Sequence, residues 1–545
     1  MSLGSRLLAE LYQLPRRTCR AVRLPVVMVE MSDGVKLETL RYSPAIPGKH
    51  PTLLMRLPYG LRGFATVAEC YAERGFNVVI QSCRGTGRSG GEFDPLSNER
   101  ADGLRTLSWI RQQPWFDGRL GTSGPSYLGY AQWAICDALP EISAMATKVT
   151  SAEFRSVVFP GGALHLGLWL SWLQTVVGLR RNPLQTARLM WSGGIERRTL
   201  RASLKLPLQD ADRHVTDSTV PFWQRWVTEA VDNDRFWEAL DHTHRLNHRT
   251  PPNHFISGWY DFMIDQLLRD YETLVLSGHR PYLTVGTWFH VSGELQKESV
   301  RETLTWMRAQ LLKEPGMLRE KPVRLHISGL NEWREFANYP PGEPDIQIWH
   351  LHHDRVLSPR PVKAALPNVY RYDPGQPTPN LGGAIFAFTG AGAVDNASLE
   401  KRHDVLTYTS EPLLVPLTII GNVRVTLYAR ATLPNADFFV RLCDVNEAGK
   451  SVNICDGLIR KRSTDAAVPD DIWKLRLRLH ATAHRFERGH RLRVIVASGA
   501  HPRFARNTGT DEPLASATTL LPVDIEIFHD PARPTAIHLP VYDVE

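Results

Sequence analysis

The stretch GTSGPSYLGYAQW at residues 121–133 constrains this chain more than any other, because it predicts a sharp turn between a buried strand and a helix. Residues 121–123 can end the strand, Gly124 and Pro125 make the turn, and a helix can open directly after Ser126. A serine hydroxyl at such a corner projects above the sheet, and the first N–H groups of the helix point at any oxyanion beside it. The turn therefore predicts that Ser126 is a nucleophile that attacks carbonyl carbons.

A second serine, Ser89, competes for this role, because GRSGG at residues 87–91 is the literal Gly-x-Ser-x-Gly pattern. Around Ser126 the second glycine comes one place later. However, Ser89 follows its predicted strand only after several loop residues, and Pro95 argues against a helix directly behind it. A serine on an exposed loop is not aimed at a substrate, so Ser126 is the preferred candidate and Ser89 the rival.

Composition and charge exclude several classes of function. The 64 basic and 57 acidic residues give a net charge of +7, and the basic clusters are short and scattered, so we expect no nucleic-acid-binding surface. The glycine pattern GTGRSG at residues 85–90 lacks the helix that dinucleotide binding needs, and a surface turn is the better interpretation. Six cysteines without a CxxC pair indicate free thiols in a reducing cytoplasm. Arg6 and Glu10 interrupt the N-terminal leucines, so we expect no export signal.

Residues 156–179 carry no formal charge and are long enough to cross a membrane. Pro160 and two glycines break the beginning of this segment, and polar residues interrupt the rest, so a buried helix of a cap domain is the better interpretation. The surrounding residues 151–245 hold six of the 15 tryptophans, which suggests an apolar cap over a pocket. They are Trp169, Trp172, Trp191, Trp223, Trp226 and Trp237.

On either side of this insertion, short apolar runs alternate with helical patterns, which predicts an α/β sheet. The predicted strands are residues 26–30, 36–42, 53–57, 76–81, 144–149, 254–258 and 282–286. After about residue 345 the pattern changes to short strands separated by turns, which is typical of a β-sandwich. We therefore expect a discontinuous α/β catalytic domain at 1–150 and 246–345, a helical cap at 151–245 and a C-terminal β-sandwich at 346–545.

A nucleophilic serine needs an imidazole that takes its proton and a carboxylate that fixes the tautomer of the imidazole. In α/β-hydrolases the acid and then the histidine follow the serine, each just beyond a strand end. Asp261 ends the strand of HFISGWYD and His290 ends YLTVGTWFH, so both fit this order. Asp265 and Asp270 are rivals for the acid, but they fall in the following helix. Four other histidines are expected at the surface: His242, His244, His248 and His279.

The oxyanion of such a reaction needs two hydrogen-bond donors. The Tyr127 N–H follows the nucleophile directly and supplies one. The second donor should come from the loop after the strand at 53–57, where Tyr59 could offer its hydroxyl in place of a backbone amide. From spacing alone, Tyr59 is equally well explained as an ordinary turn tyrosine.

Several characteristic motifs are distributed along nearly the whole chain. They are MSDGVKLETLRYSP, RLPYG, VVIQSCRGTGRSGGEF, GPSYLGYAQW, GWYD and VGTWFH, followed by RHDVLTYTSEPL, ADFFVRLCDV and ERGHRLRV. With these motifs the chain resembles the cocaine esterase family, which is grouped with the X-prolyl dipeptidyl-peptidases of the S15 type. The late glycine of Ser-Tyr-Leu-Gly is this family's own form of the nucleophile turn.

The resemblance implies an α/β-hydrolase core, a helical cap and a C-terminal jelly-roll-like β domain packed against the site. By motif match it implies that Ser126, Asp261 and His290 form a triad, and that Tyr59 and the Tyr127 amide form the oxyanion hole. It also implies a substrate pocket, whose candidates are Trp172, Phe262, Met263 and Phe386.

The resemblance also bears on the substrate. Relatives that hydrolyse α-amino-acid esters carry extra carboxylates directly after the triad aspartate, where this chain has Phe262 and Met263. We also expect no counterpart of the long N-terminal domain of bacterial X-prolyl peptidases. We therefore expect a small-molecule ester with an apolar or aromatic acyl part.

Nothing in the pattern calls for another component. The histidines at 242–248 and 350–353 lack convincing metal-ligand spacing, so no metal or organic cofactor is expected. We also expect that the protein does not bind a membrane, and that it can form a homodimer. Two alternatives stay open, namely an amidase or X-prolyl dipeptidyl-peptidase on the same triad, and a non-catalytic protein that binds its partner through the β-sandwich.

Overall fold

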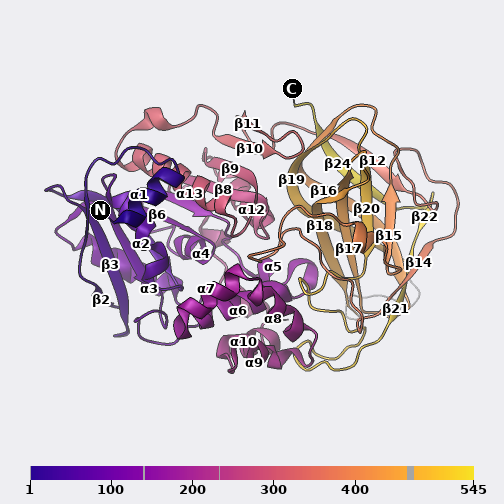
Figure 1. Cartoon of the computed structure of the whole chain (residues 1–545), viewed down its shortest axis with the longest axis horizontal. Coiled ribbons are helices and arrows are strands. Elements are labelled where there is room, and N and C mark those ends of the chain that lie inside the picture. The colour runs from indigo at the N-terminus through magenta and orange to yellow at the C-terminus, as the bar shows by residue number, and fades with distance from the viewer. Residues whose placement is uncertain (1, 139–140, 232, 463–471, 545) are drawn as a thin grey trace.

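The structure is a computed structural model that describes residues 2–138, 141–231, 233–462 and 472–544. A large mixed sheet with its helices forms one side of the molecule, a strand-rich region forms the other, and a group of helices lies against both (Figure 1). The strand order of the large sheet is β1-β3-β5-β4-β6-β7-β8-β9-β10-β11, with β2 paired to β3. These strands are β1 Ala21–Arg23, β2 Val27–Glu30, β3 Lys36–Pro44, β4 His50–Leu57, β5 Asn77–Ser82, β6 Phe116–Pro125, β7 Ala144–Lys148, β8 Asn253–Tyr260, β9 Tyr282–Phe289, β10 Val323–Ile327 and β11 Glu332–Phe336.

The sheet is parallel from β5 to β10 and antiparallel at its edges. Parallel strands are covered on both faces, which explains why β4 alternates its apolar side chains between two cores. Leu53 and Met55 join the core under α2 and α13, whereas Leu54 joins the core under α3, α4 and α12. The helices of this part are α1 Leu3–Leu11, α2 Ala65–Ala72, α3 Glu99–Arg111, α4 Tyr127–Trp133, α12 Ile264–Leu276 and α13 Gly293–Leu311.

Between β7 and β8 the chain leaves the sheet and forms α5 to α11. The uncharged segment folds mainly as α6, which is buried because α7, α8 and α9 pack around it. In the described part of the chain, no helix is long and apolar enough to cross a membrane. The helices are α5 Arg155–Val158, α6 Leu166–Arg181, α7 Pro183–Trp191, α8 Gly194–Ser203, α9 Ala211–Thr216, α10 Pro221–Thr228 and α11 Asp234–Glu238.

Two expectations for this region are wrong. Trp191 does not cover a pocket, because it ends α7 with its side chain 89% exposed. His242 is buried rather than at the surface, since the chain returns to the sheet here. The backbone N–H of His242 donates to the Ala152 carbonyl over 3.0 Å, and the His242 ring packs on Tyr130 with 5.0 Å between ring centroids.

The C-terminal region holds two antiparallel sheets that share one apolar core. The first has the order β13-β12-β24-β16-β21-β14 with β19 beside β16, and the second has the order β15-β20-β17-β18. Inward side chains such as Leu427, Phe438 and Val494 fill the space between them. The elements are β12 Asp345–Leu351, β13 Leu357–Ser358, β14 Asn368–Tyr372, α14 Ala397–Glu400, β15 Val405–Thr409, β16 Leu417–Ala431, β17 Ala436–Val445, β18 Ser451–Lys461, β19 Trp473–Phe486, β20 Arg491–Ala497, β21 Val523–Ile527, β22 His529–Asp530, β23 Arg533–Pro534 and β24 Ala536–Tyr542.

Candidate active site

Ser126 lies on the turn between β6 and α4, where the sequence predicts it, with φ 57° and ψ −122°. A non-glycine residue rarely adopts a positive φ, so this turn stores strain that its neighbours must hold. Two hydrogen bonds do so. The Ser126 N–H donates to the Lys148 carbonyl over 2.9 Å, and the Thr150 hydroxyl donates to the Ser126 carbonyl over 2.8 Å.

The packing of this turn explains why its second glycine comes one place late. A Cβ at Gly129 would lie 2.4 Å from the Thr150 methyl group, the same Thr150 that holds the turn. At the preceding position, Leu128 packs over Gly124, where a Cβ would lie 2.3 Å from the Cβ of Leu128. The turn therefore requires glycine at 124 and 129 and accepts leucine at 128.

Ser89 has a different environment. Its hydroxyl donates to the Ser82 carbonyl and accepts from the Glu38 N–H, both over 2.9 Å. These bonds tie the glycine-rich loop to β3 and β5, and the next helix begins only at Glu99. The Ser89 hydroxyl is thus engaged in holding a loop.

Asp261 and His290 follow the ends of β8 and β9, at the same edge of the sheet as Ser126. The distance between His290 Nδ1 and Asp261 Oδ1 is 2.8 Å, and both side chains are buried. The other carboxylate oxygen of Asp261 accepts from the Ser257 hydroxyl over 3.0 Å. Because a carboxylate only accepts, Nδ1 carries the proton in this bond and Nε2 is left as the basic nitrogen.

The two rival carboxylates have other partners. Asp265 accepts from the Asn422 side chain over 2.7 Å and from the Ala481 N–H over 2.9 Å, which joins α12 to the C-terminal sheets. Asp270 accepts from the Ala152 N–H over 2.8 Å, and burial raises its pKa to about 7.

Tyr59 lies two residues beyond the end of β4, and its hydroxyl interacts with Ser126. The Trp172 Nε1–H donates to the same hydroxyl over 3.1 Å. An indole N–H only donates, so the hydroxyl must accept there and keeps its own proton for a bond on the Ser126 side. Burial raises the pKa of Tyr59 to about 12, so the hydroxyl remains a donor at neutral pH. Trp172 therefore orients Tyr59, a contact that the sequence did not reveal.

Ser126, Tyr127 and all four predicted pocket residues line one cavity of about 20 Å³. This space holds roughly one water molecule. Phe262 connects the cavity to His290, since the two rings lie 4.4 Å apart between centroids. Several other lining residues carry no individual signal in the sequence, although the tryptophan enrichment pointed to this region. They include Phe154, Leu168, Trp169 and Trp226.

Among the described residues, no group of three or more His, Cys, Asp or Glu side chains could hold a metal ion. A strained serine beside a tyrosine hydroxyl, with a buried histidine–carboxylate pair at the same sheet edge, is an arrangement suited to acyl transfer.

Comparison with known proteins shows the family of the chain. The family model of X-Pro dipeptidyl-peptidase (S15 family) matches residues 33–292, and that of the X-Pro dipeptidyl-peptidase C-terminal non-catalytic domain matches residues 315–538. The cocaine esterase of Rhodococcus sp. (strain MB1 Bresler) is 30% identical over 94% of this chain and 98% of that protein. The chain belongs to the cocaine esterase family. It is therefore an enzyme of the serine hydrolase class, which includes esterases and peptidases.

Two solved structures show the fold. An aminopeptidase from the marine sediment archaeon Thaumarchaeota archaeon and an α-amino acid ester hydrolase each give a TM-score of 0.81 at 21% identity. Each alignment covers 97% of this chain and 98% of the other. The predicted α/β-hydrolase-like fold with a strand-rich C-terminal domain is confirmed at this level.

Proposed function

We propose that this enzyme hydrolyses carboxylic esters, with Ser126 as nucleophile, His290 as general base and Asp261 as the carboxylate that orients the base. The observation that carries the proposal is the buried 2.8 Å bond between His290 and Asp261, at the sheet edge that also presents the strained Ser126. A neutral imidazole held by a carboxylate takes a serine proton and is stabilised when it becomes a cation.

The reaction proceeds as acyl transfer to water. Ser126 Oγ attacks the ester carbonyl carbon while His290 Nε2 takes the hydroxyl proton. The oxygen that becomes negative accepts from the Tyr59 hydroxyl and from the Tyr127 N–H, which is at the first turn of α4 and has no partner within the helix. His290 then gives its proton to the leaving alcohol. A water molecule attacks the acyl-enzyme with His290 again as base, and this releases the acid and restores Ser126.

The proposed substrate has an apolar or aromatic acyl part. The cavity beside Ser126 is lined by aromatic and aliphatic side chains, and Phe262 and Met263 offer no charge to a substrate ammonium. In this proposal α5 to α11 act as a cap, because α6 and α10 bring Trp169, Trp172 and Trp226 over the cavity. The C-terminal domain, for which a jelly-roll-like topology stays a prediction, supplies Phe386.

A fluorophosphonate probe tests the nucleophile, because it phosphonylates only an activated serine. We expect labelling of the wild type and of Ser89→Ala, and no labelling of Ser126→Ala. Turnover of p-nitrophenyl esters by Ser126→Ala should fall about 10⁴–10⁶-fold. Label that survives Ser126→Ala and disappears with Ser89→Ala would overturn the assignment, and an unlabelled wild type would favour the non-catalytic binding protein.

The same preparation separates esterase from peptidase. We expect p-nitrophenyl esters to be hydrolysed with a higher kcat/KM than Gly-Pro p-nitroanilide. Faster cleavage of the anilide would assign the enzyme to the X-prolyl dipeptidyl-peptidases on the same triad.

A further inference from the structure

A loop of the C-terminal domain, residues 383–392, lies beside the proposed catalytic residues. The two ends of this loop bind each other, since Gly383 and Gly392 exchange N–H···O bonds of 2.7 and 3.0 Å. Between these ends, the Phe386 ring lies 5.7 Å from His290 and 6.2 Å from Phe262, measured between centroids. Phe386 also lines the cavity of Ser126. A loop of one domain thus forms a wall of the site in another.

Helix α8 holds the tip of the 383–392 loop. The N–H groups of Phe388 and Thr389 donate to one carboxylate oxygen of Glu196, over 2.7 and 3.2 Å. Because Phe388 also packs on Phe386, with 5.5 Å between ring centroids, this anchor bears directly on the position of Phe386.

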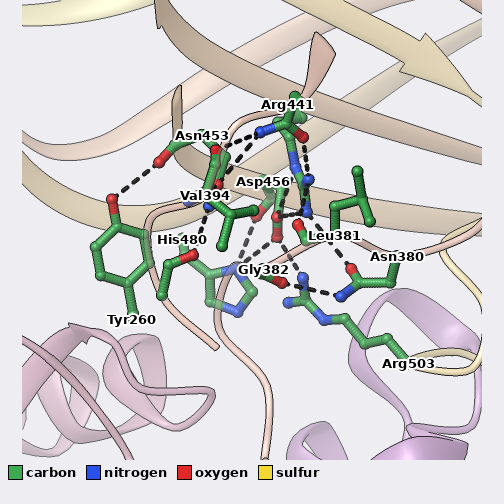
Figure 2. Close-up of polar contacts among 12 residues, drawn as sticks. Tyr260, Asn380, Leu381, Gly382, Val394, Arg441, Asn453, Asp456, His480 and Arg503 are labelled. Atoms are coloured by element: carbon green, nitrogen blue, oxygen red, sulfur yellow. Dashed lines mark hydrogen bonds and ion pairs between the residues drawn. The ribbon is translucent and has the colours of Figure 1, made fainter. Parts of the chain in front are cut away.

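A buried arginine holds the base of the loop. Arg441 in β17 is fully buried, and its Nη1 donates to the Leu381 carbonyl and to the Asn396 side chain, each over 2.6 Å. These two contacts flank the loop on either side. Asp456 in β18 accepts from Arg441 Nη2 over 2.8 Å and so fixes the guanidinium (Figure 2).

The same strand, β18, also holds the end of β8. The Asn453 side chain accepts from the Val394 N–H over 2.8 Å and donates to the Gly392 carbonyl over 3.1 Å. The Asn453 carbonyl accepts from the Tyr260 hydroxyl over 2.9 Å (Figure 2). Since Tyr260 precedes Asp261, one strand places both the loop and the carboxylate of the proposed triad.

Arg441, Asp456 and Arg503 form a buried ion cluster. Burying these charges costs free energy of desolvation that apolar side chains would not cost. Burial alone would raise the pKa of Asp456, but Arg503 and Arg441 hold it well below its usual value, so the carboxylate is ionised. Arg503 donates to the other oxygen of Asp456 over 2.6 Å. The two arginines thus share one carboxylate, whereas Arg441 also binds the segments beside the loop.

We propose that Arg441 and Glu196 are positioning residues of the esterase, which fix the 383–392 loop at its base and tip so that Phe386 selects the acyl group. The inference rests on the proposed function and extends it, because it names residues outside the pocket that hold Phe386 in place. Neither residue touches the reacting atoms; both act through Phe386.

Selectivity tests this directly, measured as the ratio of kcat/KM for p-nitrophenyl benzoate to that for p-nitrophenyl acetate. Arg441→Lys keeps the charge beside Asp456, but one ammonium cannot replace the fork of donors that a guanidinium offers. We expect Arg441→Lys to change the ratio by about 5-fold or more, in the same direction as Phe386→Ala. In the double variant the ratio should equal that of Phe386→Ala alone, because the two changes act through one side chain.

Arg503→Lys is the matched control, since it alters the same ion cluster without a bond to the segments beside the loop. Its ratio should stay within about 2-fold of the wild type even if its Tm falls as much as that of Arg441→Lys. Equal changes of the ratio in both lysine variants, or additive effects in the double variant, would overturn the inference.

Glu196→Ala is a second test in case Arg441→Lys does not fold. It removes the carboxylate that holds the tip of the loop against α8. The ratio should again change in the direction of Phe386→Ala, whereas the neighbouring Arg197→Ala should leave it unchanged. An unchanged ratio for Glu196→Ala in an active enzyme would overturn this inference and leave the proposed function standing. A wild type that hydrolyses neither ester would overturn the proposed function and this inference with it.

Discussion

Tyr59→Phe removes one hydroxyl and leaves the ring in place, so it isolates the proposed second oxyanion donor. In the wild type the Tyr59 hydroxyl accepts from Trp172 Nε1–H over 3.1 Å and lies beside Ser126. Burial raises the pKa of this hydroxyl to about 12, so it holds its proton at neutral pH. In the proposed mechanism, the variant therefore loses a donor to the oxygen where charge develops.

The size of the effect follows from these two bonds. One oxyanion donor is worth about 3 kcal/mol in the transition state, so kcat should fall about 100-fold while KM changes little. The Tyr127 amide remains, which is why activity should be reduced and not abolished. The Trp172 N–H is left without its acceptor, and this should lower the free energy of unfolding by about 1–3 kcal/mol.

Steady-state hydrolysis of p-nitrophenyl esters gives kcat and KM, and urea unfolding gives the free energy. Tyr282→Phe is the matched control, because it removes a hydroxyl that donates to the Arg319 carbonyl over 2.7 Å, away from the cavity. It should lose a similar free energy of unfolding and keep kcat. A Tyr59→Phe enzyme whose kcat stays within about 3-fold of the wild type, with a raised KM, would refute the oxyanion role and leave Tyr59 as a binding residue.

Three other substitutions follow from the packing. Gly129→Ala should lower kcat about 10-fold or more by displacing Thr150, whereas Gly316→Ala, whose Cβ would meet nothing within 4 Å, should not. Burial raises the pKa of Asp270 to about 7, so between about pH 4 and 7 the folded state keeps a proton that the unfolded state releases. The free energy of unfolding of the wild type should therefore fall by about 4 kcal/mol as the pH rises from about 4 to 7. Urea unfolding of Asp270→Asn should lack this slope, and an unchanged slope would contradict the assignment. Burial lowers the pKa of Lys148 to about 7, so the unfolded state binds the extra proton and stability should rise from about pH 7 to 10, a slope that Lys148→Met should abolish.

Local patterns predicted seven of the eleven strands of the large sheet, β2 to β5 and β7 to β9, and the end of β6, because a hairpin signal and continuous apolar runs mark them. The strands β1, β10 and β11 were not predicted. Each predicted strand lies within three residues of its observed bounds, and the largest differences are at β4 and β9. The strand β19 was not predicted, although leucine alternates there with basic residues at 474–479 and the leucines are buried in the structure. This period-of-two pattern was available in the sequence.

The chain order of serine, acid and histidine predicted which strand ends meet, since parallel strands bring their carboxyl ends to one edge. The pocket could not be predicted in this way. Phe386 lies more than a hundred residues beyond Phe262, and no local pattern relates the two, so it was named only through the family resemblance. The bond from Trp172 to Tyr59 joins α6 to the loop after β4, and the cluster around Asp456 joins side chains that lie far apart in the sequence, so periodicity encodes neither. The cytoplasmic location and the homodimer stay predictions.

A crystal structure of the enzyme inhibited by an aryl phosphonate tests the central claim most directly, because its tetrahedral phosphorus imitates the acyl-transfer transition state. The account predicts a bond from Ser126 Oγ to phosphorus, with the phosphoryl oxygen about 2.7–3.1 Å from the Tyr59 hydroxyl and the Tyr127 nitrogen. The aryl group should lie between Trp172 and Phe386. Phosphorus bound to another residue, or a phosphoryl oxygen turned away from both donors, would contradict it.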